Sequence, residues 1–217
     1  MGCVAAVLAL LIAALVFGTA GRSRMRIWET HRRAANDAPR ADTAWAPLTA
    51  LGARQAEDQI VALGAGSSGP VFASVRPADF AAYMMLDVAG TLPPRADSAR
   101  AAAGHGRLWI RTRADLATTL PEGMLGRGLA LMGGRPPVEL GGTVDIIRPG
   151  VAEFRVEALR IHDWSAPRAL IPAIIRHLEA GRHPADVATD GLLLNLPAYV
   201  ADVRMTPGKV VFYKSIP

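Results

Sequence analysis

A glycine-rich hexapeptide is the first stretch of this chain whose residue types and spacing could carry chemistry. Gly64 to Gly69 reads GAGSSG, the GxGxxG spacing of a dinucleotide-binding turn, and Asp87 follows about 20 residues later, where such sites place a ribose-binding acid. That turn must lead into a helix whose first amides face the phosphates. Here Val71 to Val75 has the composition of a strand, and Pro77 then opens a new helix. Nucleotide binding through Gly64–Gly69 is therefore the lesser alternative, and a flexible turn is the preferred interpretation.

The other reactive side chains form no recognisable catalytic or metal-binding pattern. None of the five histidines has the spacing of a zinc-binding helix, and the chain has no G-x-S-x-G turn to present a nucleophilic serine. The single cysteine, Cys3, excludes an internal disulfide and a cysteine-based zinc site. His162, His177 and His183 could meet aspartates in space, although such residues at element ends more often cap and solvate them. We expect no catalytic residue, no metal, no cofactor and no enzyme activity.

Composition and charge restrict the partners. The chain has 217 residues, of which 51% are hydrophobic, so it is long enough for one domain with a full core and an appendage. Its formal net charge is +5, and the arginines are spread along the whole chain with one local concentration between Arg22 and Arg33. A nucleic-acid groove would need a basic stripe with interleaved aromatic residues. We therefore expect no nucleic-acid partner and a general preference for anionic surfaces.

An uncharged apolar run begins the chain. It extends from Cys3 to Phe17 and continues to Ala20, about 18 residues, which is the lower limit for spanning a bilayer as a helix. We predict an uncleaved signal-anchor in residues 1–21, and the small residues up to Ala20 leave cleavage open as an alternative. Residues 22–47 are expected to form a juxtamembrane segment and linker, because they are polar, arginine-rich and interrupted by prolines. Residues 48–217 are expected to form a single domain.

A β-hairpin followed by a helix forms the centre of the expected domain. Apolar and polar residues alternate from Val138 to Arg148 and again from Val151 to His162, on either side of the turn dipeptide Pro149-Gly150. The alternation slips by one residue near Ala158, which predicts a β-bulge. The helix is expected from Pro167 to Ala180, with Ser165 as its N-cap, Pro172 as a kink or a loose start, and Gly181 as its stop. Its apolar face carries Leu170, Ile171, Ile174, Ile175 and Leu178.

Further elements surround this centre. Helical spacing predicts helices at 48–63, 77–86 and 122–131, and strand patterns appear at 71–75, 107–113, 191–196, 199–205 and 209–213. In the strand at 107–113, Leu108 and Ile110 share one face and Trp109 lies with the arginines on the other. The dipeptide Pro207-Gly208 joins the last two strands as a second hairpin, and 88–105 is expected to be a loop or an irregular strand. The fold class is α+β: a curled antiparallel sheet packed on one main amphipathic helix, with an N-terminal transmembrane helix.

The order of these elements resembles a known group of proteins. An N-terminal anchor, a strand that leads into a short helix, a hairpin that leads into one amphipathic helix, and terminal strands containing Leu196-Pro197-x-Tyr199-Val200-x-Asp202-Val203 resemble the YpmS-like family of anchored bacterial proteins and tubular lipid-binding (TULIP-like) domains. The resemblance covers about Val71 to Tyr213 and consists of pattern, with no diagnostic motif. It implies a curled sheet around a helix with an apolar interior that holds an acyl chain. Leu170, Ile171, Ile174 and Ile175 would then line the side of the helix that faces the sheet.

These observations lead to one functional hypothesis and one alternative. The first is a single-pass protein of the bacterial inner or plasma membrane that binds an apolar, lipid-like ligand or an envelope protein, with residues 170–178 as the apolar lining. The alternative is a structural or scaffolding membrane protein with a filled core and no ligand. The resemblance implies that the domain lies on the extracytoplasmic side. The arginines after the apolar run favour the opposite orientation by the positive-inside rule, so both orientations remain open.

Overall fold

The computed structural model describes residues 44–65, 70–89, 99–113, 136–162, 164–178 and 184–215. The chain divides into two compact units, Met1–Ala38 and Pro39–Pro217, and all described residues belong to the second unit. The expected anchor at 1–21, nearly all of the expected linker at 22–47, and the expected helix at 122–131 lie outside the described residues.

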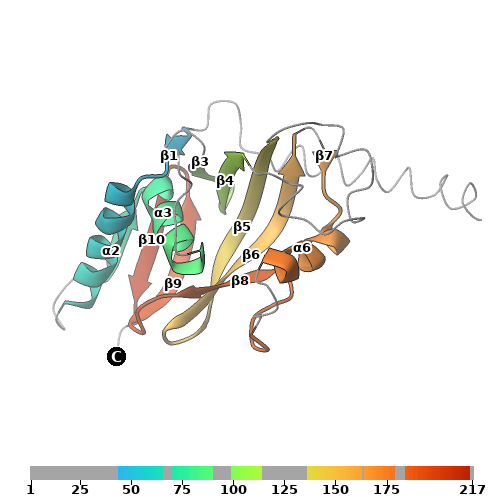
Figure 1. Cartoon of the computed structure of the whole chain (residues 1–217). Coiled ribbons are helices and arrows are strands. Elements are labelled where there is room, and N and C mark those ends of the chain that lie inside the picture. The colour runs from blue at the N-terminus through green and yellow to red at the C-terminus, as the bar shows by residue number, and fades with distance from the viewer. Residues whose placement is uncertain are drawn as a thin grey trace, which may run out of the picture. The chain divides into compact units, whose positions relative to one another are not determined.

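The described unit is an α+β domain with antiparallel sheets, as the sequence predicts (Figure 1). The larger sheet has seven strands: β1 (Ala46–Pro47), β3 (Ala99–Gly104), β4 (Arg107–Arg113), β5 (Pro137–Arg148), β6 (Val151–Ile161), β7 (Trp164–Ser165) and β8 (Gly191–Asn195). They are ordered β1-β3-β4-β5-β6-β7, and β8 also pairs with β6. The domain thus includes Ala46 and Pro47, which the sequence assigns to the linker, and a regular strand, β3, where the sequence predicts a loop or an irregular strand.

A smaller, three-stranded sheet holds the C-terminal part of the chain. Its strands β2 (Phe72–Val75), β10 (Lys209–Lys214) and β9 (Val200–Thr206) lie in that order, all antiparallel. The predicted terminal hairpin is therefore confirmed. Its turn places Gly208 at φ 73°, in the left-handed region that glycine occupies without steric cost.

The central hairpin and its bulge are also confirmed. β5 and β6 pair from Val138–Ile161 to Arg148–Val151, and the register shifts between Gly141, opposite Ala158, and Gly142, opposite Val156. Glu157 is the extra residue of the bulge. The shift lets Phe154 and Val156 before it, and Leu159 and Ile161 after it, all face the core, where each is buried.

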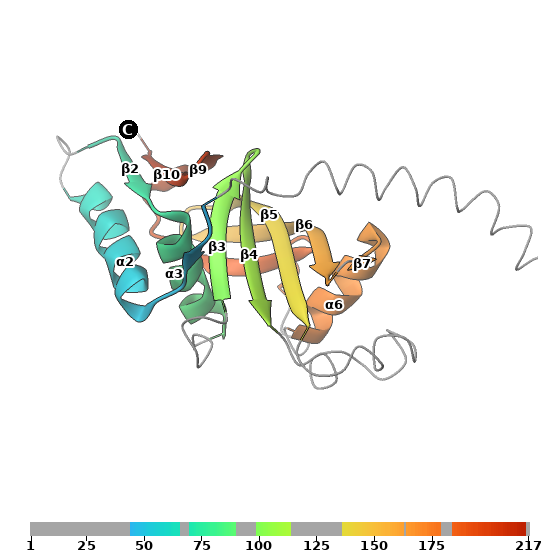
Figure 2. The ribbon, with the colours of Figure 1, turned by 90° about the horizontal axis from the view of Figure 1, so that it is seen from above.

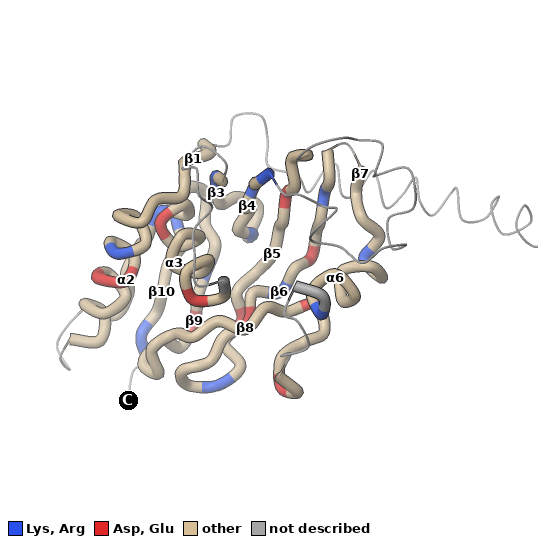
Figure 3. The backbone as a smooth tube through the Cα atoms, viewed as in Figure 1, with Lys and Arg blue, Asp and Glu red and all other residues tan. Residues whose placement is uncertain are grey.

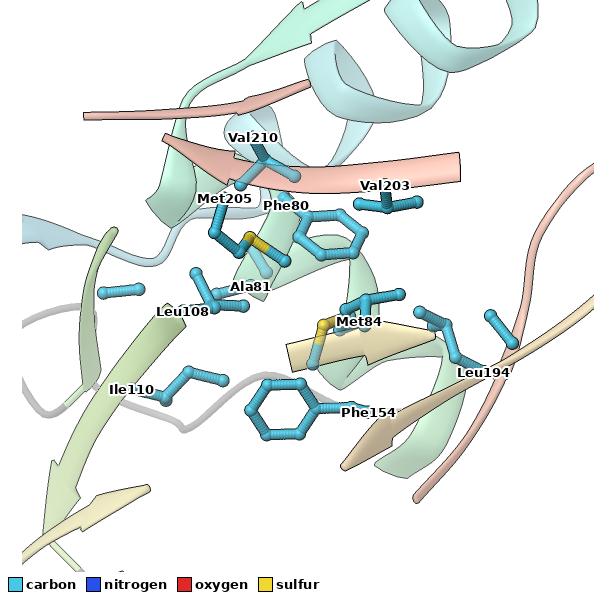
Figure 4. Packing of buried hydrophobic residues seen from close by; sticks show 14 of the residues in the cluster. Phe80, Ala81, Met84, Leu108, Ile110, Phe154, Leu194, Val203, Met205 and Val210 are labelled. Atoms are coloured by element: carbon cyan, nitrogen blue, oxygen red, sulfur yellow. The ribbon is translucent and has the colours of Figure 1, made fainter. Parts of the chain in front are cut away.

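Three described helices lie against these sheets: α2 (Ala50–Gly64), α3 (Pro77–Ala89) and α6 (Ile171–Leu178). The side chains of α3 contact both sheets, since Phe80 meets Phe212 of β10 edge-to-face at 5.1 Å and Met84 lies near Phe154 of β6 and Leu194 of β8 (Figure 4). The prediction of one main helix at 167–180 is therefore wrong. The eight residues of α6 cover one end of the larger sheet, and α3 lies near the opposite end (Figure 2). Helical periodicity alone could not reveal this, because it does not rank helices by their packing.

The start of α6 also differs from the prediction. Ser165 belongs to β7 and does not cap a helix, because the chain forms a 3-10 turn, η2 (Arg168–Leu170), before the α-helix begins at Ile171. Pro172 consequently lies in the first turn, where its missing amide hydrogen leaves no helical hydrogen bond unmade. The loose start of the helix is confirmed, and its expected end at 180 lies outside the described residues.

Candidate functional site

The apolar face predicted for helix 167–180 lies on α6 and on the turn before it. Ile171, Ile174 and Ile175 are 2%, 6% and 1% exposed and belong to the hydrophobic core. Leu170 is partly buried and packs against the same core. The side chain of Leu178 lies outside the described residues. Of the five predicted lining residues, the structure therefore places three in the core and one at its border.

Strand β6 lies beside α6, and its hairpin with β5 has an apolar inner face. Val138 pairs with Ile161 and Leu140 with Leu159, and all four side chains belong to the hydrophobic core or pack against it. The short helix α6 lies beside β6 and β8, at the end of the sheet that carries β7 (Figure 2). The 3-10 turn η2 that precedes α6 receives no side-chain cap at Pro167. Within the described residues, this helix–hairpin interface has no polar group suited to catalysis.

A buried carboxylate fixes the chain that leads into β8. Glu153 of β6 is 3% exposed, and its Oε2 accepts a hydrogen bond of 2.7 Å from the amide of Ala188. Its Oε1 accepts hydrogen bonds from Nε and Nη2 of Arg155, which raise the pKa of that guanidinium above its ordinary value. At Gly191 a Cβ atom would lie 2.8 Å from Oε2 of Glu153, so a larger residue there would require the carboxylate to shift. Because both oxygens of Glu153 have partners, we assign it a structural role.

The end of α3 is tied to the other edge of β8. Asp87 accepts hydrogen bonds from the backbone amide of Asn195 at 2.8 Å and from its Nδ2 at 3.1 Å, and the hydroxyl of Tyr83 donates to the carbonyl oxygen of Asn195 at 3.1 Å. Burial, and then the negative charge of Asp87, raises the pKa of Tyr83 to about 12. The carboxylate of Asp87 therefore binds Asn195 of the same chain.

The nucleotide-binding alternative is contradicted by the order of the elements around Gly64. Gly64 is the last residue of helix α2, and the next described element is strand β2, whereas a dinucleotide turn needs the strand first and the helix second. Residues 66–69 lie outside the described residues. A Cβ atom at Gly64 would lie 2.4 Å from the ring of Tyr199, whose hydroxyl donates to the carbonyl oxygen of Ile60. Gly64 thus allows the close approach of Tyr199 to α2.

Trp109 is a buried residue that the sequence analysis does not identify. It lies on the outer face of the larger sheet, the face opposite Leu108 and Ile110, as strand alternation predicts. Yet it is 0% exposed, and its ring lies across Gly141 of β5, where a Cβ atom would be 2.5 Å away. Its Nε1 is buried and has no acceptor among the described residues. The signal in the sequence is the glycine at the cross-strand position, which becomes visible only once the register is known.

The histidines do not converge on a metal site where the structure describes them. His105 and His162 stand in turns with φ values of 55° and 54°, and the side chains of His177 and His183 lie outside the described residues. Across the described ranges, no group of three His, Cys, Asp or Glu side chains is arranged to hold a metal ion.

Two further findings concern membrane-spanning helices and similarity to known proteins. Within residues 44–215, as far as they are described, no helix is both long enough and apolar enough to cross a membrane. Comparisons with protein-family models, with curated proteins and with solved structures found no match.

Proposed function

We propose that this chain is a membrane-anchored protein of the bacterial envelope whose domain binds an apolar, lipid-like ligand between α6 and the β5–β6 hairpin. The observation that carries the proposal is the amphipathic face of α6, where Ile171, Ile174 and Ile175 are buried in the hydrophobic core beside β6 and β8. The resemblance to YpmS-like and tubular lipid-binding proteins also supports it. Such domains use apolar surfaces between a helix and a curved sheet to hold acyl chains.

The free energy gained by burying the isoleucines of α6 is similar to the free energy that a buried acyl chain would gain, so a ligand could replace the helix on the sheet. An eight-residue helix is too short to be stable alone, so α6 depends on its contacts. Full burial of each isoleucine contributes about 1.5–3 kcal/mol, hence roughly 5–9 kcal/mol for the three. An acyl chain gains about 0.8 kcal/mol for each buried CH₂ group, so roughly six to eleven such groups would match that sum. A ligand of this size could occupy the hairpin face if α6 moves outward.

A scaffolding protein without a ligand is the second candidate, and one observation favours it. The side chains of α6, β5 and β6 fill one continuous core with those of α3, so in this conformation the lining residues contact each other. A protein that uses its domain only as a rigid body would show this packing permanently.

Native mass spectrometry of the full chain in detergent separates the two candidates. We expect the wild type to keep one lipid-mass adduct after the detergent is stripped. Ile174→Asn should lose that adduct, whereas Leu51→Asn, which alters a leucine of α2 that is 67% exposed, should keep it. Circular dichroism on both variants checks that they fold. Identical native mass spectra for the wild type and both variants, with or without adducts, would favour the scaffolding protein.

A further inference from the structure

Four charged residues form one row across the outer face of the larger sheet. Arg100 of β3 stands opposite Arg111 of β4, Arg111 opposite Glu139 of β5, and Glu139 opposite Arg160 of β6. Residues directly opposite on adjacent strands lie on the same face with Cβ atoms about 4.5–5.5 Å apart. Figure 3 shows basic segments on β3, β4 and β6 at this end of the sheet, with an acidic segment of β5 between β4 and β6. We call these four residues the arginine row.

The single acid of the row is shared by two arginines. Glu139 accepts a hydrogen bond of 2.7 Å from Nε of Arg111 and lies 3.6 Å from Nη1 of Arg160. Arg100 is exposed and has no hydrogen bond or ion pair among the described residues. The Nε atom of Arg160 is buried and likewise has no acceptor there. The row therefore carries excess positive charge, and the direct opposition of Arg100 and Arg111 is unfavourable unless an anion lies between them.

An indole ring orients the centre of the row. The Cζ atom of Arg111 lies 4.2 Å from the ring centroid of Trp45, which directly precedes β1. With one edge bound to Glu139 and one face against Trp45, the guanidinium of Arg111 is held in a fixed plane. Arg100, whose side chain has no partner among the described residues, stands opposite this oriented guanidinium on β3, and paired arginines are suited to bind phosphate oxygens. Tryptophan next to basic residues is also typical of the membrane–water interface.

We infer that Arg100, Arg111 and Trp45 form a binding site for the phosphate group of an anionic phospholipid at a bilayer surface. The phosphate would supply the charge that the row lacks and relieve the repulsion between Arg100 and Arg111. The first described strand, β1, pairs with β3 and places Pro47 opposite Arg100. The apolar run that we expect to anchor the chain, Cys3 to Ala20, precedes this point in the sequence.

This site is independent of the ligand proposed beneath α6. The arginine row lies on the outer face of the larger sheet, whereas Ile171, Ile174 and Ile175 belong to the core on its inner face. Loss of anionic-lipid binding at the row would leave the apolar site intact, and the converse also holds.

The test uses the full chain in micelles of a neutral detergent. Short-chain phosphatidylglycerol, short-chain phosphatidylcholine and inorganic phosphate are titrated separately, and binding is followed by calorimetry. We expect phosphatidylglycerol to bind the wild type and phosphatidylcholine not to bind. Arg100→Gln should weaken phosphatidylglycerol binding at least about tenfold, because it removes a charge-assisted donor. The control Arg54→Gln removes an exposed arginine of α2 and should bind like the wild type. Without lipid, Arg100→Gln should melt at the wild-type temperature or higher.

Four results would overturn the inference. Equal affinity of the wild type and Arg100→Gln for phosphatidylglycerol would exclude Arg100 from any site. An equal loss in Arg54→Gln would show that net charge alone attracts the lipid. Inorganic phosphate that binds as tightly as phosphatidylglycerol would exclude a lipid as the source of the phosphate. Lipid adducts that depend on Ile174 but not on Arg100 would leave the proposed function standing while the arginine row fails.

Discussion

At the scale of single residues, Trp109 and Gly141 show how burial arises on an outward face. Strand alternation places Trp109 with the arginines, and the structure confirms that face while burying the ring completely. The ring can lie flat against β5 because the opposite residue on that strand, Gly141, has no side chain. That fact depends on the β4–β5 register, which links positions about thirty residues apart and which no local pattern contains.

Substitution of Gly141 by alanine should therefore destabilise the domain. The new Cβ atom would lie 2.5 Å from the indole of Trp109, so the ring or the strand must shift, at a cost of about 1–3 kcal/mol. Gly104→Ala is the matched control in the same sheet, since a Cβ atom there meets nothing within 4 Å. Urea unfolding of both variants measures the difference. Equal midpoints for the two variants would contradict the proposed packing of Trp109.

At the scale of elements, the sequence predicts those with a strong local pattern. The strand at 107–113, the hairpin with its bulge, and the helices at 48–63 and 77–86 are confirmed because apolar periodicity and turn residues agree at each of them. For β3 the sequence leaves a loop and an irregular strand open, because Ala99–Gly104 is mainly alanine, which has little strand preference and is placed by its pairing with β4. The sequence does not predict that α3, rather than α6, is the helix in contact with both sheets, because this follows from tertiary packing.

The contact of α3 with β8 should make stability depend on alkaline pH. The pKa of Tyr83 is raised from 10.0 to about 12 in the folded chain, so folding favours the protonated phenol. Its contribution is complete below the unfolded pKa and is lost as pH rises from 10.0 towards about 12. Urea unfolding at several pH values in this window should show a steeper loss of stability for the wild type than for Tyr83→Phe. Parallel curves for the two proteins would place Tyr83 in water.

At the scale of the whole molecule, we expect the chain to combine a membrane anchor with a folded domain. The apolar run from Cys3 to Ala20 predicts that the full chain stays with membranes through an alkaline carbonate wash, and that a variant without residues 3–20 is released. Fractionation followed by immunoblotting measures both. Release of the full chain by the wash would contradict the predicted anchor. Alkaline carbonate removes proteins that are held by charge, whereas a membrane-spanning helix stays in the bilayer.

The orientation of the domain is a separate prediction at this scale. We expect a reporter fused after Pro217 to report an extracytoplasmic position, as the resemblance to anchored lipid-binding proteins implies. The arginines between Arg22 and Arg33 favour the cytoplasmic side instead. An alkaline-phosphatase fusion is active only outside the cytoplasm and a fluorescent-protein fusion only inside it. Activity of the second alone would contradict the expected orientation.

The most direct test of the central claim is a crosslinking map with a photoactivatable fatty acid. The full chain in detergent is incubated with a diazirine-bearing acyl probe, irradiated and digested, and the modified peptides are identified by mass spectrometry. If α6 and the β5–β6 hairpin hold the ligand, the label should concentrate on peptides that contain Ile171–Leu178 and the inner face of β5 and β6. Competition by excess unlabelled fatty acid should remove it. Label confined to residues 3–20 and to exposed side chains such as Leu51 and Phe72, and insensitive to competition, would contradict ligand binding by the domain.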